Sequence, residues 1–186
     1  MKRAANAFAP ASAARNGGAS GDGGKKVIAR LPAALDIYQI GVVVADLYAG
    51  MARYGALLGL SNWKRMDTDY IGRYRDWQGR IANRNAFAPW GAIHLEMIEP
   101  GVGDGNAKEW LRMRGEGIFH VGVATDDVRD RPLEADVIFE VLSQRQPDGS
   151  AAIVHLDTVA ALGFFVELTW RPMAQRLDDW VRSAID

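Results

Sequence analysis

The chain has 186 residues, of which 48% are apolar and 24% are charged, which suffices for one well-buried core but not for two ordinary domains. Lysine and arginine together number 22 against 23 aspartates and glutamates, and the basic residues are scattered, so we expect no nucleic acid partner. There is no cysteine, which excludes disulfides, thiolate catalysis and thiolate metal sites.

The N-terminal segment differs in composition from the rest. Residues 1–31 are rich in Ala, Gly, Ser, Asn and basic residues and have no period that could bury a face, so we expect a disordered tail. The patterns that follow predict one domain over 32–172 and a C-terminal helix over 173–186. No apolar run approaches the roughly 18 to 20 residues that cross a bilayer, and no secretory signal is visible. We therefore expect a soluble, cytoplasmic protein with no membrane partner.

A strand and a helix open a first module that spans residues 37–100. The run from Ile37 to Val44 is apolar and β-branched, which is typical of a buried strand. Asp46 then stands where a helix N-cap belongs, and the apolar residues after it recur at helical spacing: Leu47, Met51, Tyr54 and Leu57 or Leu58. Gly59 is suited to end that helix.

The rest of the first module is predicted to be mainly extended. The stretch from Trp63 to Ala92 indicates short strands and turns, and Ala92 to Ile98 indicates another strand. After a glycine-rich loop, Asn106 and Glu109 form the asparagine variant of a capping box. They predict a short helix through Arg114.

A second module over 117–172 repeats the pattern with less helix. A strand from Gly117 leads to the acidic residue Asp127, and three further strands are expected: Val137 to Leu142, Ala151 to Asp157 and Gly163 to Thr169. The C-terminal helix carries Leu177, Trp180, Val181 and Ala184 on one face. The predicted class is α+β, with two tandem βαβββ modules forming curved mixed sheets.

The two modules share a motif at each end. The start Gln39-Ile-Gly-Val-Val-Val-Ala-Asp46-Leu returns as His120-Val-Gly-Val-Ala-Thr-Asp-Asp127-Val, and Glu96 near the end of the first module corresponds to Glu167 in the second. An internal duplication of this kind implies a pseudo-twofold axis. The axis would bring Gln39, Glu96, His120 and Glu167 to one point.

Those four side chains match the needs of a divalent cation. Each begins or ends an apolar strand, where a polar group is costly to bury without a partner. Two carboxylates balance the charge of the cation, and an amide oxygen and an imidazole nitrogen complete the protein ligands. The duplication therefore predicts a metal site at Gln39, Glu96, His120 and Glu167, with zinc, nickel, cobalt, manganese or magnesium as the candidate ion.

The same residues resemble the vicinal oxygen chelate superfamily, which includes glyoxalase I, methylmalonyl-CoA epimerase, extradiol dioxygenases and bleomycin-resistance proteins. The resemblance covers residues 37–172. It implies a glyoxalase-like fold in which paired βαβββ modules surround a metal-holding cup, and it implies a homodimer. By position the four candidate ligands correspond to the family's ligand set, and the set Gln, Glu, His, Glu is similar to that of one class of glyoxalase I.

Two members of the superfamily are nearest in motif. The stretch from Ala107 to His120 looks like methylmalonyl-CoA epimerase, whereas the ligand set looks like glyoxalase I. At the positions where glyoxalase I has an arginine and an asparagine for glutathione, this chain has Val43 and Pro100. Epimerases carry a catalytic glutamate in the middle of the first module, and residues 61–95 contain none. The resemblance therefore leaves the substrate open.

The chemistry implied is proton abstraction beside a chelated carbonyl through an enediolate-like intermediate, as in an isomerase, epimerase or lyase. We expect Glu167 to be the base, with Glu96 as its symmetric counterpart, because a carboxylate released from the cation into an apolar cup regains basicity. His94 lies two residues before Glu96 and is a candidate to relay a proton or to support that ligand.

Other readings remain open. A non-catalytic module of the bleomycin-resistance type would sequester a small molecule, and an iron dioxygenase would need two histidines and a carboxylate, with only His94 available to replace Gln39. His155 and Asp157 are interpreted as a structural pair near the rim. A small-molecule substrate is expected, and an aromatic one would suit five interleaved aromatics: Trp63, Tyr70, Tyr74, Trp77 and Trp90.

Overall fold

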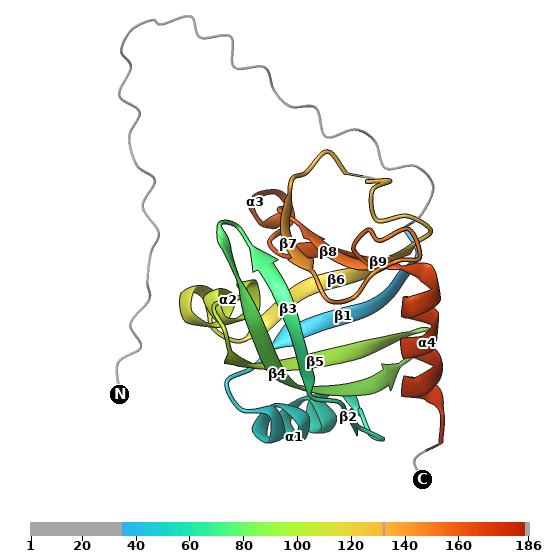
Figure 1. Ribbon diagram of the computed structural model, residues 1–186. Coiled ribbons are helices and arrows are strands. Elements are labelled where there is room, and N and C mark those ends of the chain that lie inside the picture. Colours follow the sequence, from blue (N-terminus) through green and yellow to red (C-terminus); the bar gives the residue numbers. More distant parts are fainter. Residues whose placement is uncertain (1–34, 132, 185–186) are drawn as a thin grey trace, which may run out of the picture.

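The computed structural model describes residues 35–131 and 133–184 (Figure 1), so the predicted tail over 1–31 lies outside the described residues. The elements follow one another in the order β1 (Ile37–Val43), α1 (Leu47–Leu58), β2 (Lys64–Arg65), β3 (Thr68–Tyr74), β4 (Trp77–Trp90), β5 (Ile93–Val102), α2 (Asn106–Arg114), β6 (Gly117–Thr125), β7 (Val137–Val141), β8 (Ile153–Leu156), α3 (Val159–Leu162), β9 (Phe165–Trp170) and α4 (Arg171–Arg182). The predicted α+β class is confirmed.

A mixed sheet of nine strands dominates the fold, in the order β2-β4-β3-β7-β8-β9-β6-β1-β5. Strand β4 also pairs with β5, so the sheet closes on itself (Figure 1). The first strands of the two modules, β1 and β6, pair antiparallel at the centre. Each also pairs in parallel with the last strand of its own module, β1 with β5 and β6 with β9. The predicted two-module curved sheet is confirmed.

The pairing of β1 with β6 carries the pseudo-twofold relation between the modules. Gln39 lies opposite Gly122, Ile40 opposite Val121 and Gly41 opposite His120. In the parallel pairs, Gly41 lies beside Glu96 and Gly122 beside Glu167. Each candidate ligand on β1 or β6 therefore has a glycine on the facing strand, and each glutamate lies on the strand beyond that glycine.

Helix α1 begins and ends as its sequence predicts. The side chain of Asp46 caps the first turn by accepting a hydrogen bond from the backbone N–H of Ala49 at 2.8 Å, and Gly59 ends the helix in the left-handed region with φ 69°. The helix covers the outer face of β1 and β5 over a buried apolar cluster that includes Val42, Leu47 and Met97.

The second module has no such helix among the described residues. An irregular segment follows β6 instead, and its Val128 and Leu133 cover the outer face of β8 and β9 by packing on Val154 and Val166. Apolar side chains of this irregular segment therefore take the place of the helix on this face.

Two local predictions are wrong. Residues 77–90 form one strand of 14 residues rather than several short ones, because pairing with β3 on one side and β5 on the other holds it extended. Asn106 is not the N-cap of α2: Gly105 occupies that position, and the buried Asn106 side chain bonds to His155.

Helix α4 packs against β4, β5, β6 and β9 and lies across the ends of these strands (Figure 1). Its Ala174 and Val181 are buried, whereas Ala184, predicted on the same face, is exposed beyond the helix end. Among the residues that the structure describes, no helix is long and apolar enough to cross a membrane.

Candidate metal centre and active site

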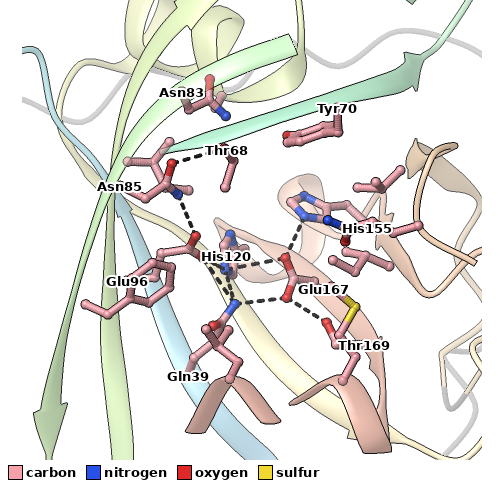
Figure 2. Close-up of a pocket in the computed structure, with 18 of the residues that line it drawn as sticks. Gln39, Thr68, Tyr70, Asn83, Asn85, Glu96, His120, His155, Glu167 and Thr169 are labelled. Atoms are coloured by element: carbon pink, nitrogen blue, oxygen red, sulfur yellow. Dashed lines mark hydrogen bonds and ion pairs between the residues drawn. The ribbon is translucent and has the colours of Figure 1, made fainter. Parts of the chain in front are cut away.

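The four candidate ligands meet inside the sheet (Figure 2). His120 Nε2 lies 3.3 Å from Glu96 Oε2 and 3.7 Å from Glu167 Oε2. Gln39 Nε2 lies 2.9 Å from His120 Nε2, 2.9 Å from Glu167 Oε1 and 3.2 Å from Glu96 Oε2. The structure thus brings together side chains from β1, β5, β6 and β9, which the duplication placed at equivalent positions.

Two glycines make room for these side chains. A Cβ atom built on Gly41 would lie no farther than 2.6 Å from the Cε1, Nε2 and Nδ1 atoms of His120, and one built on Gly122 would overlap Gln39 in the same way. Real Cβ atoms essentially never come that close. The repeated Gln-x-Gly and His-x-Gly patterns therefore reflect a spatial requirement: each ligand lies flat on the glycine of the other module.

Glu167 is held from all sides. Its Oε1 accepts hydrogen bonds from Tyr38 Oη at 2.9 Å, from Thr169 Oγ1 at 2.8 Å and from Gln39 Nε2, and its Oε2 lies 3.0 Å from His155 Nε2. Burial acts to raise the pKa of Glu167, but the nearby His120 charge and the contacts with His155 outweigh it and hold the pKa below 4.5. Glu167 is therefore an ionised, immobile carboxylate.

The surroundings of Glu167 also shift the pKa values of its neighbours. Burial, and next the charge of Glu167, raise the pKa of Tyr38 well above 10.0, so that the phenol remains a hydrogen-bond donor. Burial acts to lower the pKa of His120, yet the charges of Glu167 and Glu96 outweigh it and raise the pKa above 6.5. Burial lowers the pKa of His155. The two carboxylates, Glu96 and Glu167, therefore favour a positive charge at the position of His120, but burial prevails at His155.

The donor set fits a divalent cation. The two hydrogens of Gln39 Nε2 serve its contacts with Glu96 and Glu167, so its third contact, with His120 Nε2, has no hydrogen left if that nitrogen is an acceptor and is repulsive if it is a donor. His120 Nδ1 is buried and has no hydrogen-bond partner among the described residues. Two carboxylates, an imidazole and an amide provide the nitrogen and oxygen ligands and the double negative charge that zinc, nickel, cobalt or manganese requires. The ligand roles themselves remain a prediction.

Glu96 is less constrained than Glu167. Its Oε1 accepts a hydrogen bond from Asn85 Nδ2 at 2.7 Å, and its Oε2 accepts one from Gln39. The side chain is 12% exposed and lines the cavity. The two symmetric glutamates therefore differ in their hydrogen-bond donors, which the sequence did not reveal.

His94 lies behind Gln39 and does not line the cavity. Its fully buried ring contacts Gln39 Oε1 through Nε2 at 3.0 Å and Asp178 Oδ1 through Nδ1 at 3.0 Å. Burial lowers the pKa of His94 even though Asp178 opposes that effect. Its position therefore does not support a direct proton relay to a substrate. His94 does contact a candidate ligand, but that ligand is Gln39 rather than the predicted Glu96.

His155 belongs to the site, and its interpretation as a rim residue paired with Asp157 is wrong. Strand β8 pairs with β9 so that His155 lies opposite Glu167, while Asp157 is exposed beyond the strand. Asn106 Oδ1 accepts from the Ala107 N–H at 3.1 Å, which turns Asn106 Nδ2 toward His155 Nδ1 at 2.9 Å. His155 Nδ1 then accepts a hydrogen bond, so its Nε2 carries the hydrogen donated to Glu167.

A cavity of about 370 Å³ opens above the four residues. Its walls are largely apolar and aromatic, and they include Tyr38, Phe87, Phe119, Phe139 and Trp180. Of the five aromatics predicted to line a pocket, only Tyr70 does so; Trp63, Tyr74, Trp77 and Trp90 lie elsewhere. Polar groups also face the cavity from Thr68, Asn83 and Gln144.

Helix α4 contributes Met173, Arg176, Leu177 and Trp180 to the cavity wall. Nothing in the helical pattern of residues 173–185 indicated that this helix borders the site. The sequence also missed Tyr38, which side-chain alternation would turn away from Gln39. A shift in register between Ile37 and Gln39 brings it to the same side.

Comparisons with known proteins agree with this architecture. Residues 38–151 match the model of the Glyoxalase/Bleomycin resistance protein/Dioxygenase superfamily. Among solved structures, methylmalonyl-CoA epimerase from Mycobacterium tuberculosis is 22% identical with a TM-score of 0.51, and the match covers 76% of this chain and 93% of that one. This likeness supports the fold.

Two further structures are similar at lower TM-scores. Methylmalonyl-CoA epimerase from Streptomyces coelicolor in complex with 2-nitronate-propionyl-CoA is 26% identical, with a TM-score of 0.47 over 74% of this chain and 98% of that one. The hypothetical protein BH1468 from Bacillus halodurans C-125 is 20% identical, with a TM-score of 0.48 over 72% and 92%. A comparison with curated protein sequences found none that matches.

Proposed function

Because the chain belongs to the glyoxalase/bleomycin resistance protein/dioxygenase superfamily, we propose that it is a metal-dependent isomerase, epimerase or lyase that removes a proton next to a carbonyl group of a small molecule. One observation carries the proposal: Gln39, Glu96, His120 and Glu167 converge on one buried point at the base of a cavity. These four residues would hold the cation. When bound, it would act as a Lewis acid for negative charge on substrate oxygens.

The two glutamates would have different roles. The sequence favours Glu167 as the base, but four hydrogen-bond contacts and a lowered pKa make it a weak base and a fixed anion. Glu96 has fewer donors and lines the cavity. We therefore assign proton abstraction to Glu96 and the permanent negative charge to Glu167, following the rule that paired carboxylates divide roles by environment.

The surrounding residues would prepare the site for this step. Tyr38, Thr169 and His155 hold Glu167 by hydrogen bonds, and Asn85 orients Glu96. The aromatic cavity walls would exclude water from the carbanion, leaving an enediolate-like anion to be reprotonated from the same or the other face. The volume of the cavity, about 370 Å³, suits a compact substrate or the reacting end of a larger one.

Metal analysis and solvent deuterium exchange test the proposal. The purified protein should carry one divalent ion per chain, and Glu167→Ala should lose it. In the loaded protein, a panel of enolisable 2-oxo and hydroxy-carbonyl compounds should include one that exchanges its proton. Glu96→Gln should slow that exchange by about 10²–10⁴-fold, whereas Glu140→Gln, on the outer face of β7, should not. Metal-loaded protein that exchanges none of the panel would refute proton abstraction.

The contribution of each glutamate is separable in the same assay. If Glu96→Gln keeps both the ion and the exchange activity, while Glu167→Gln keeps the ion and loses exchange, the base is Glu167 and our assignment is reversed. If the protein purifies without metal and still binds a ligand, the non-catalytic module is the better description.

The structure also contains a candidate site for a dioxygenase. His120, His155 and Glu167 offer two imidazoles and a carboxylate whose ligand atoms all lie within 4.8 Å of one another, which is the ligand set of non-haem iron enzymes. However, the contact from Asn106 places the hydrogen of His155 on Nε2, facing Glu167. A protonated nitrogen does not bind a metal, so the arrangement favours His155 as a support for Glu167.

A further inference from the structure

A chain of contacts connects helix α4 to the candidate metal centre. Asp178 Oδ1 lies 3.0 Å from His94 Nδ1, and His94 Nε2 lies 3.0 Å from Gln39 Oε1. His94 and Gln39 are almost completely buried, at 0% and 1% exposure. Because the ring of His94 is packed edge-on against Tyr38 and Phe87, it cannot turn away from either partner.

The first contact dictates where His94 carries its hydrogen. An ionised carboxylate can only accept hydrogen bonds, so Nδ1 must be the donor toward Asp178. A neutral imidazole carries one hydrogen, and Nε2 is therefore left with a lone pair that faces Gln39. That lone pair requires an N–H from the Gln39 amide.

The Gln39 amide faces opposite demands at its two ends. In the structure its Nε2 points to Glu96, His120 and Glu167, and its Oε1 points to His94. This orientation suits the two carboxylates but sets Oε1 against the lone pair of His94. Turning the amide over in place would satisfy His94 but would aim Oε1 at two negative charges, which is favourable only with a cation between them.

We propose that Asp178 is a positioning residue for the candidate metal centre: through the tautomer of His94, it stabilises the orientation in which Gln39 presents its amide oxygen to the cation. The effect on cation binding rests on the proposed function. The effect of Asp178 on the position of the His94 hydrogen does not, because it concerns the cation-free protein. With the neutral imidazole described above, all contacts along the chain are satisfied only in the cation-bound orientation, so Asp178 strengthens cation binding without touching the ion.

The residue that begins this chain of contacts lies outside the part of the sequence that matches the superfamily model, which ends at residue 151. Glu167 also lies beyond that match, but Asp178 is the one of the two that comes from the C-terminal helix. The same helix lines the substrate cavity through Leu177 and Trp180, so the helix that borders the substrate also orients a ligand.

The substitution Asp178→Asn has an expected sign. An asparagine side chain can donate its Nδ2 hydrogen to His94 Nδ1, which moves the imidazole hydrogen to Nε2 and satisfies Gln39 Oε1 in the cation-free orientation. Cation affinity should fall by about 10–100-fold, the usual effect of losing a group that orients a metal ligand. Asp179→Asn is the matched control, because Asp179 is exposed and bonds to Gln175 on its own helix.

Two measurements test the proposal. Calorimetric titration with Zn²⁺ or Mn²⁺ should show the loss of cation affinity in Asp178→Asn. Affinity should recover in Asp178→Glu, which restores an acceptor-only group, and it should be unchanged in Asp179→Asn. Nitrogen-15 NMR of the cation-free protein, with the His94 signals assigned from His94→Gln, should show the hydrogen on Nδ1 in the wild type and on Nε2 in Asp178→Asn. A change in fold alone would not move the hydrogen from one ring nitrogen to the other.

The outcomes separate this inference from the proposed function. If the wild type binds cation and Asp178→Asn binds it as tightly as Asp179→Asn does, the positioning role is refuted while the metal site stands. If cation-free Asp178→Asn keeps the hydrogen on Nδ1, the tautomer argument is refuted whatever the affinity. If the wild type binds no cation, the proposed function fails, and the positioning role fails with it.

Discussion

Replacing Gly41 with alanine should displace His120 and destabilise the sheet at its centre. The new Cβ atom would lie 2.2 to 2.6 Å from three ring atoms of His120, whereas ordinary van der Waals contact begins at 3.4 Å, so the nearest of these atoms must retreat by about 1.2 Å. The ring cannot do this freely, because Phe119 and His155 pack against it at centroid distances of 5.3 and 5.2 Å.

The expected cost follows from overpacking a buried site. Inserting a methyl group into a filled core typically costs about 1–3 kcal/mol. In a domain of this size, each kcal/mol lowers the melting temperature by about 2–4 °C. Urea unfolding of the metal-free protein should therefore show a lower midpoint for Gly41→Ala without a change in slope.

A double-mutant cycle isolates the cause. In a His120→Ala background the ring is gone and the methyl group has room, so Gly41→Ala should cost almost nothing there, which gives a coupling free energy of about 1–3 kcal/mol. If Gly41→Ala costs the same in both backgrounds, the alanine acts through the backbone rather than through His120. The explanation of the repeated Gly two residues after each ligand would then be wrong.

Three further expectations concern the scaffold and its charges. Asp46→Ala should lower the free energy of unfolding by about 0.5–2 kcal/mol because α1 loses its cap; equal stability by urea unfolding would contradict this. Phe119→Ala should cost about 3–5 kcal/mol in the same assay, since the ring is 1% exposed, and a cost near zero would argue against a packed cavity floor. Arg129 lowers the pKa of Asp127 to about 2 from 3.8, so the folded state gains stability above pH 3.8 that is lost as the pH falls toward 2. NMR titration should show the pKa of Asp127 return toward 3.8 in Arg129→Gln. An unchanged pKa would show that Arg129 is not the cause.

Much of this protein could be predicted from repetition in its sequence. The pairs Gln39 with His120 and Glu96 with Glu167 share their sequence surroundings, and two copies of one motif fold into two copies of one strand arrangement. A pseudo-twofold pairing of β1 with β6 then places all four side chains on one face near one point. Local signals were also sufficient for α1, because its cap and its terminating glycine are adjacent in sequence.

The prediction failed where a residue depends on a partner distant in the chain. Asn106 has the sequence of a helix cap, but its amide bonds instead to His155, 49 residues away. The 14 residues of β4 contain turn-forming types, yet they stay extended because strands pair with them on both sides. Local propensity amounts to about 1 kcal/mol or less per residue, and tertiary pairing overrides it.

The ligand positions are thus encoded in the duplicated motif, since their convergence needs only alternation along strands and a twofold relation. Three features arise only from folding: the unequal environments of the two glutamates, the ring nitrogen on which His94 and His155 each carry a hydrogen, and the contact of Asp178 with His94. They depend on which side chains from β8, α2 and α4 arrive beside the duplicated core. These neighbours break the symmetry of the repeat, because Glu167 has His155 opposite it where Glu96 has Phe87, and because α2 lies between the two modules and α4 follows the last strand. Hydrogen-bond partners that meet across the folded chain leave no periodic trace in the sequence.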